Sequence, residues 1–206
     1  MSKNTETGTR RGGLKRFGTQ NMLPLFIIAM AVVATAIEPK FATVDNLLNL
    51  ARQIMPLLIL ATGQAFAIIS GGLDLSLAAV MSLAGVVGVL AMADYGPFVG
   101  IAIMLLVGVG MGLVSGSIIA YFQVSPLVVT LGVLSVAQAL ALILSGGVPI
   151  YSIHSGYADV VGFGVFLGVP VTVWLGCGCA VVGAFVLRHT VFGRHVYAIG
   201  SSASAA

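Results

Sequence analysis

Asp74 is the residue best placed to do chemistry in this sequence, because it is the only charged residue between Arg52 and Asp94. It lies in the run Ile69-Ser70-Gly71-Gly72-Leu73-Asp74-Leu75-Ser76, within a stretch that is apolar enough to lie in lipid. A carboxylate at that depth is costly. Either local geometry stabilises it, or a transporter uses it as a proton or cation relay.

Two neighbouring features favour a structural role for Asp74. Gly71 and Gly72 tolerate the backbone angles of a chain reversal. Asp74 then precedes an apolar run, where a capping carboxylate accepts from the first N–H groups of a helix and the helix dipole favours its charge. A relay normally needs ionisable partners, and the membrane segments predicted after Asp74 contain no other Asp, Glu, Lys or Arg. We predict a turn and helix cap made by Gly71, Gly72, Asp74 and Ser76.

A second set of polar residues has the spacing of a solute pathway. Thr130, Gln138 and Ser145 fall within about 80° of one another on a helix, and Ser135 lies at the edge of that arc. Together with Thr62 and Gln64, their hydroxyl and amide groups could line a path for a polyhydroxylated solute. The alternative is hydrogen bonding between helices, which these residue types commonly provide.

The sequence offers no sign of catalysis. It lacks the Gly-x-x-x-x-Gly-Lys-Ser/Thr loop that binds ATP phosphates, and it has no metal-ligand cluster and no nucleophile motif. We therefore predict no catalytic residue, no metal and no cofactor in this polypeptide.

The composition predicts the elements that position these residues. Of 206 residues, 59% are hydrophobic and 7% are charged, whereas soluble domains have about 25% charged residues. A membrane-spanning helix needs about 20 apolar residues. We therefore predict an all-α polytopic membrane protein with about six transmembrane helices, over residues 22–37, 54–70, 75–93, 98–120, 126–144 and 162–187.

The basic residues predict the orientation. With both termini in the cytoplasm, seven Lys and Arg residues lie inside and two, Lys40 and Arg52, lie outside, which satisfies the positive-inside rule. Residues 1–21 are interpreted as a basic cytoplasmic tail rather than a nucleic-acid patch, residues 22–187 as the transmembrane domain and residues 188–206 as a cytoplasmic segment.

Three further patterns concern packing and the outer surface. Gly108, Gly112 and Gly116 recur every four residues and predict a ridge for close helix packing. Residues 44–55 predict an amphipathic helix on the outer interface. The polar and aromatic connector 145–161 suits the outer headgroup layer, and its His154 is interpreted as solvated surface rather than a contact to a ligand.

Three stretches resemble the permease subunits of bacterial ABC importers for monosaccharides, the ribose/xylose/galactose type. The first and most specific is Gly63-Gln64-Ala65-Phe66-Ala67-Ile68-Ile69-Ser70-Gly71-Gly72-Leu73-Asp74-Leu75-Ser76. The second is Val124-Ser125-Pro126-Leu127-Val128-Val129-Thr130-Leu131-Gly132 with Ser145-Gly146-Gly147. The third, Phe192-Gly193-Arg194-His195-Val196-Tyr197-Ala198-Ile199-Gly200 with Ala205-Ala206, is similar to the segment that meets the ATPase.

The resemblance implies the function and the assembly. It implies ATP-driven import of a monosaccharide across the bacterial inner membrane, with a second permease subunit, a separate ATP-binding subunit and a periplasmic sugar-binding protein as partners beside membrane lipid, and with no nucleic acid. It places contact with the ATPase at Gly193, Arg194, Tyr197 and Gly200.

The sequence departs from the family pattern in two places. It has Ser202 where members usually carry Asn, and Ala203 and Ser204 where acidic residues are common. Family permeases also continue for about four more spans, so the chain is expected to be a fragment with an incomplete permease fold. The alternatives are an ion-coupled secondary carrier and a non-functional truncated remnant.

Overall fold

The structure is a computed structural model that describes residues 11–201, with side chains from Met22 onward. The first ten residues of the predicted basic tail, the departures at Ser202, Ala203 and Ser204, and the motif residues Ala205 and Ala206 lie outside the described residues. The chain forms two compact units that divide between Leu50 and Ala51.

The first unit contains the helix α1, Arg11–Ile37, and a short 3-10 turn, Pro39–Ala42. The carboxylate of Glu38 accepts a hydrogen bond from the N–H of Lys40 at 3.2 Å, which caps the turn. The side-chain amide of Asn46 then donates to the Phe41 carbonyl at 2.8 Å and closes the connection into the next helix.

That next helix, α2, corrects one predicted boundary. It runs without a break over Val44–Ile69, so the amphipathic residues 44–55 are its first turns and not a separate element. Pro56 lies inside it. Proline removes one backbone hydrogen bond but does not always end a helix when neighbouring contacts hold it. The change from an amphipathic to an apolar pattern therefore marks no change in the backbone.

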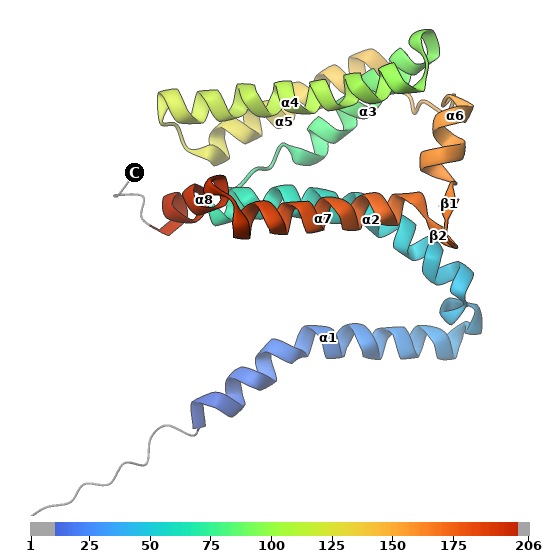
Figure 1. Cartoon of the computed structure of the whole chain (residues 1–206), viewed down its shortest axis with the longest axis vertical. Helices are drawn as coiled ribbons and strands as arrows, with labels where there is room; N and C mark the ends of the chain where they lie inside the picture. The colour runs from blue at the N-terminus through green and yellow to red at the C-terminus, as the bar shows by residue number, and fades with distance from the viewer. Residues whose placement is uncertain (1–10, 202–206) are drawn as a thin grey trace, which may run out of the picture. The chain divides into compact units, whose positions relative to one another are not determined.

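In the second unit, three helices pack closely together: α3 (Leu77–Tyr95), α4 (Pro97–Phe122) and α5 (Pro126–Ser145) (Figure 1). Leu83, Ala137 and Ala141 form their buried core. Gly96, with φ at +82°, turns α3 directly into α4, a conformation that glycine adopts readily. These helices begin or end within three residues of their predicted positions.

Two further helices, α7 (Val171–His189) and α8 (Val191–Ser201), lie beside α2 (Figure 1). Glycines on α7 allow the close approach to α2, because a Cβ on Gly176 would meet the side chain of Met55 and one on Gly183 would meet that of Thr62. The short helix α8 packs on the end of α7.

The connection between α5 and α7 differs from the prediction that a span begins at residue 162. It contains a single helical turn, α6 (Ser155–Tyr157), a π-helical turn (Ala158–Gly162) and an antiparallel hairpin of β1 (Val165–Phe166) and β2 (Val169–Pro170). Both hairpin-turn residues have positive φ, 53° at Leu167 and 77° at Gly168, which matches the twist of paired strands. Apolar composition did not distinguish this hairpin from a helix.

Within residues 11–201, five helices are long and apolar enough to cross a membrane: α2, α3, α4, α5 and α7. The apolar stretch Met22–Ile37 of α1 is shorter than these five. Many large apolar side chains on these helices are exposed, as expected where a helix face meets lipid. The predicted all-α polytopic membrane fold is confirmed.

Candidate functional site

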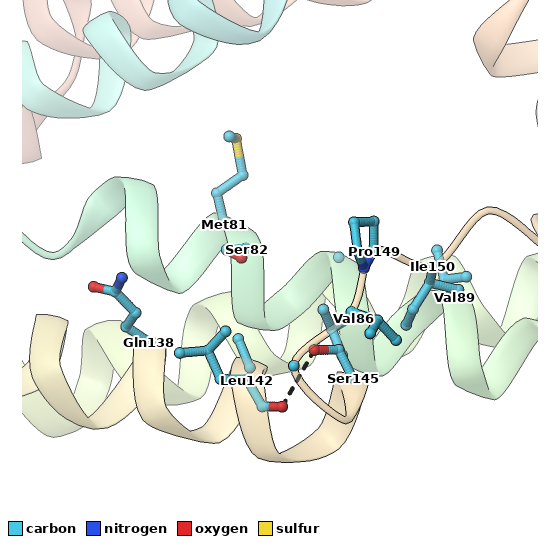
Figure 2. Close-up of a pocket in the computed structure, with 13 residues that line it drawn as sticks. Met81, Ser82, Val86, Val89, Gln138, Leu142, Ser145, Pro149 and Ile150 are labelled. Atoms are coloured by element: carbon cyan, nitrogen blue, oxygen red, sulfur yellow. Dashed lines mark hydrogen bonds between the residues drawn. The ribbon is translucent and has the colours of Figure 1, made fainter.

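A pocket of about 490 Å³ opens between α3, α5 and the connector that follows α5 (Figure 2). Its polar lining side chains are Ser82 on α3 and Gln138 and Ser145 on α5, and the Ser145 hydroxyl donates to the Leu142 carbonyl at 3.2 Å. None of the described residues that line it is charged. Its volume falls in the range of small-molecule sites, which are about 300–1,000 Å³.

The other predicted pathway residues lie elsewhere. Ser135 is exposed on α5, where its hydroxyl donates to the Leu131 carbonyl at 3.0 Å. On α2, Thr62 donates to the Leu58 carbonyl at 2.8 Å and faces α7. The Oε1 atom of Gln64 is buried and has no hydrogen-bond partner among the described residues. Of the six predicted pathway residues, Gln138 and Ser145 line the pocket.

The predicted turn before α3 has a definite hydrogen-bond pattern. The N–H of Gly71 donates to the Ile68 carbonyl at 3.0 Å, and the N–H of Gly72 donates to the Ala67 carbonyl at 2.8 Å. Gly71 has φ at +84°. This is a Schellman motif, in which a glycine with positive φ ends a helix and satisfies its last carbonyls. The glycine pair therefore ends α2.

Asp74 lies in the extended segment between that turn and α3. Its Oδ1 accepts from the Ser76 N–H at 2.8 Å and from the Ser76 hydroxyl at 2.6 Å. The helix begins at Leu77, so Ser76 and not Asp74 occupies the N-cap position. An Asp side chain readily bonds the N–H two residues ahead, and this local bond holds residues 74–76 outside the helix.

Thr130 fastens this segment to α5. Its side chain is 2% exposed, and its hydroxyl is placed to donate to the Leu73 carbonyl at 3.4 Å and to the Leu127 carbonyl at 3.3 Å. A Cβ on Gly72 would lie 3.5 Å from Pro126 Cβ, so the segment also touches the first residue of α5. Sequence spacing placed Thr130 on the same helix face as Gln138, but the 71–76 segment covers that face at Thr130.

The C-terminal end of α2, which leads into this segment, is in contact with α8. A Cβ on Gly200 would overlap the Ile69 carbonyl oxygen and lie 3.4 Å from Ser70 Cα, and one on Gly71 would lie 3.9 Å from Gly200 Cα. The rings of Phe66 and Phe192 are 6.3 Å apart. These backbone approaches explain why glycine occupies position 200.

The beginning of α8 is fixed to the end of α7. The Thr190 hydroxyl donates to the Val186 carbonyl at 2.6 Å and accepts from the Gly193 N–H at 3.1 Å, so it bridges the two helices as a cap. Gly193 is buried, and a Cβ there would meet the Leu187 and Val186 carbonyls. Arg194 and Tyr197 are exposed.

Comparison with known proteins decides the family. Residues 46–206 match a family described as the permease component of the branched-chain amino acid transport system. The chain belongs to this permease family. Together with the five apolar helices, this confirms the predicted localisation, a multi-pass protein of the bacterial inner membrane.

The permease has curated relatives along its whole length. It is 31% identical over the full chain to a ribose import permease protein of Haemophilus influenzae, of which it covers 64%, and 30% identical over the full chain to that of Escherichia coli strain K12, of which it covers 65%. An L-arabinose ABC transporter permease protein of Azospirillum brasilense is 32% identical over 95% of the chain and 58% of the relative. The permease thus spans less than two thirds of the length of these relatives. No solved structure matches it.

The predicted glycine ridge meets no other helix within the described residues, so its packing role stays a prediction. A Cβ on Gly108, Gly112 or Gly116 would meet nothing within 4 Å among the described residues. The close approach of α3 and α4 uses Gly88 and Gly100 instead, where a Cβ on Gly100 would lie 2.7 Å from the Gly88 carbonyl oxygen. Spacing identified a helix face without side chains, but it did not identify which face has a neighbour.

Within the described residues, no group of three or more His, Cys, Asp or Glu side chains is placed to hold a metal ion. The polar groups that line the pocket are the Ser82 and Ser145 hydroxyls and the Gln138 amide, on two packed helices.

Proposed function

We propose that the chain is a membrane-spanning subunit of an ATP-driven importer for a monosaccharide, with ATP hydrolysis carried out by a separate subunit. The observation that carries this proposal is the similarity, over 100% and 95% of the chain, to a ribose import permease protein and an L-arabinose ABC transporter permease protein. A catalytic role for the chain itself is not part of the proposal.

The lining of the pocket between α3 and α5 favours a neutral, hydroxyl-rich solute over a charged one. The family description names branched-chain amino acids, whereas the relatives named above are sugar permeases. An amino acid is a zwitterion, and burying its charges without partners is costly. The pocket offers an amide and hydroxyl groups, no charged side chain and apolar walls such as Val86, which suit the hydroxyl groups and C–H faces of a sugar. We therefore favour the sugar.

In this account Gln138 and Ser145 contact the solute, and Gln64 has a buried acceptor that a solute hydroxyl or a second subunit would satisfy. Both termini face the cytoplasm, and residues 22–187 form the membrane domain. A periplasmic sugar-binding protein delivers the solute at the outer face, which includes the connector after α5. Gly108, Gly112 and Gly116 offer an open ridge for packing by another subunit or by lipid.

The exposed side of α8 contacts the ATP-binding subunit in this account. Gly193 and Gly200 seat the helix on the rest of the chain, while Arg194 and Tyr197 point away from it and remain available to a partner. An exposed Arg provides charge that steers association. Hydrolysis then shifts the population between inward-open and outward-open states through this contact.

The solute is tested by uptake into cells that co-express the chain with its cognate ATP-binding subunit and solute-binding protein. Labelled ribose, L-arabinose and leucine are compared. We expect uptake of at least one sugar and none of leucine above the level of cells without the chain. Uptake of leucine alone would contradict the solute assignment. Absence of all three uptakes, with the chain present in the membrane, would favour a non-functional remnant.

A further inference from the structure

Three elements that are distant in the sequence meet at the segment between α2 and α3. Gly200 of α8 lies against the Ile69 carbonyl on one side of the Schellman turn. On its other side, Thr130 of α5 approaches the Leu73 carbonyl at 3.4 Å across 57 residues of sequence. Gly72 lies between these contacts and touches Pro126. The segment is thus bounded by α8 at one end and by α5 at the other.

We propose that Thr130 is a positioning residue that fastens the 71–76 segment to α5, so that a displacement of α8 at Gly200 is transmitted to the pathway helix. This inference rests on the proposed function, because it assigns the link between the ATPase contact and the solute pocket. Thr130 touches no part of that pocket; it acts through the Leu73 carbonyl.

The geometry makes the segment suited to transmitting a displacement. At Gly200 the contact is backbone against backbone, so no flexible side chain absorbs a shift of α8. Residues 74–76 are held by the two hydrogen bonds to Asp74 Oδ1, and Ser76 is 3% exposed. Thr130 itself is almost fully buried. Tightly packed elements move as units because interiors are dense.

A displacement at Thr130 also reaches Gln138 in the pocket wall. The two residues are eight apart on α5, slightly more than two helical turns, so a tilt or shift of the first turn of α5 moves the pocket wall that carries Gln138. The Thr130 contact is therefore the point at which the segment and the pathway helix are joined.

The test measures coupling in both directions, because coupling free energy is reciprocal. The free, exposed Cys177 and Cys179 are replaced by alanine, and one reporter cysteine is introduced into the intact chain in detergent. Val196→Cys reports on α8, where Val196 is 7% exposed, and Val129→Cys reports on α5. The rate of labelling by a small maleimide is measured at each.

Thr130→Val should raise the labelling rate at residue 196 about fivefold, as expected for loss of one hydrogen bond. Thr130→Ser keeps the hydroxyl and should restore the parent rate, and Ser135→Ala, on the exposed side of the same helix, should not change it. In the other direction, Gly200→Leu should raise the rate at residue 129, whereas Gly178→Leu, where a Cβ meets nothing within 4 Å, should leave it unchanged.

A third reporter, Met92→Cys at the contact of α3 with Gly100 of α4, distinguishes transmission from general unfolding, because Met92 is fully buried and lies near the far end of α3 from the 71–76 segment. Its rate should stay at the parent value in every variant. Unchanged labelling at residue 196 in Thr130→Val, or a parallel rise at residue 92, would overturn the positioning role. The measurement requires no transport, so a failure of sugar uptake would reject the proposed function while the labelling pattern decides the link separately.

Discussion

Gly200 of α8 and Ile69 of α2 are in backbone contact, so close that any side chain at position 200 would overlap the Ile69 carbonyl oxygen. The contact brings α8, which we propose to contact the ATP-binding subunit, against the end of α2 that carries the Gly71-Gly72 turn. It gives the glycine at position 200 a physical reason that does not depend on family resemblance.

Gly200→Ala should therefore disturb the packing of α8 against the end of α2. We expect a loss of about 1–3 kcal/mol in the free energy of unfolding, the usual cost of forcing an atom into a packed site, measured by thermal or denaturant unfolding in detergent. Gly178→Ala is the matched control, because no atom of the described residues lies within 4 Å of a Cβ there. Alanine in a helix should stabilise that site by roughly 0.5–1 kcal/mol. Equal effects of the two substitutions would reject the contact.

Thr190→Val should weaken the junction of α7 and α8. The substitution removes the hydroxyl that accepts from the Gly193 N–H and donates to the Val186 carbonyl. Loss of a helix cap costs about 1 kcal/mol, and local opening should make the α8 backbone exchange hydrogen faster. Thr190→Ser keeps the hydroxyl and should behave like the parent. Hydrogen exchange followed by mass spectrometry checks this, and equal protection in Thr190→Val would contradict the cap.

Gly100→Ala should disturb the packing of α3 against α4, whereas Gly108→Ala should not. A Cβ at position 100 would meet the Gly88 carbonyl at 2.7 Å, while one at position 108 has open space. We expect a loss of about 1–3 kcal/mol for the first and no loss for the second in the monomeric chain. Unfolding in dilute detergent measures both. Destabilisation by Gly108→Ala alone would mean that the predicted ridge, and not Gly88 with Gly100, packs the helices.

Two substitutions of Asp74 distinguish a structural role of its carboxylate from a role as a transport acid. Asp74→Asn retains an Oδ1 acceptor for the Ser76 N–H and hydroxyl, whereas Asp74→Ala removes it. We expect Asn to preserve the unfolding midpoint and sugar uptake, and Ala to cost about 1–3 kcal/mol. A proton or cation relay would require the ionisable group. Loss of uptake in Asp74→Asn with unchanged stability would therefore favour the ion-coupled carrier.

Gln138→Leu should reduce sugar uptake without affecting the fold, because the amide lines the pocket on an exposed part of α5. Loss of one good hydrogen bond to a solute corresponds to a roughly tenfold rise in the uptake half-saturation concentration. Ser135→Ala lies three residues earlier, outside the pocket, and serves as control. Equal uptake by the two variants would remove the pocket from the pathway.

Much of the fold followed from local sequence rules. Pro97 and Pro126 begin α4 and α5 where proline is tolerated, and Gly71 and Gly146 end α2 and α5 with positive φ. These signals depend on neighbours in the chain, so the sequence contains them. The hairpin at Val165–Phe166 and Val169–Pro170 was missed because a short apolar run has no period that separates strand from helix.

The site was less predictable, because it depends on contacts between distant segments. Helical spacing grouped Thr130 with Gln138 on one arc, yet it could not show that the 71–76 segment covers the first and that a pocket opens beside the second. Spacing likewise identified Gly108, Gly112 and Gly116 as a smooth face without indicating what packs there. A helical period shows which residues share a face, and tertiary structure decides what that face meets.

The most direct test of the central proposal is the energy source for uptake. Labelled ribose and L-arabinose are supplied to cells or vesicles that contain the chain with its ATP-binding subunit and sugar-binding protein. We expect uptake that requires ATP and the binding protein. It should stop with vanadate, a phosphate analogue that arrests ATP hydrolysis, and continue when a protonophore or sodium ionophore removes ion gradients. Uptake that survives vanadate and is abolished by the ionophores would contradict the proposal.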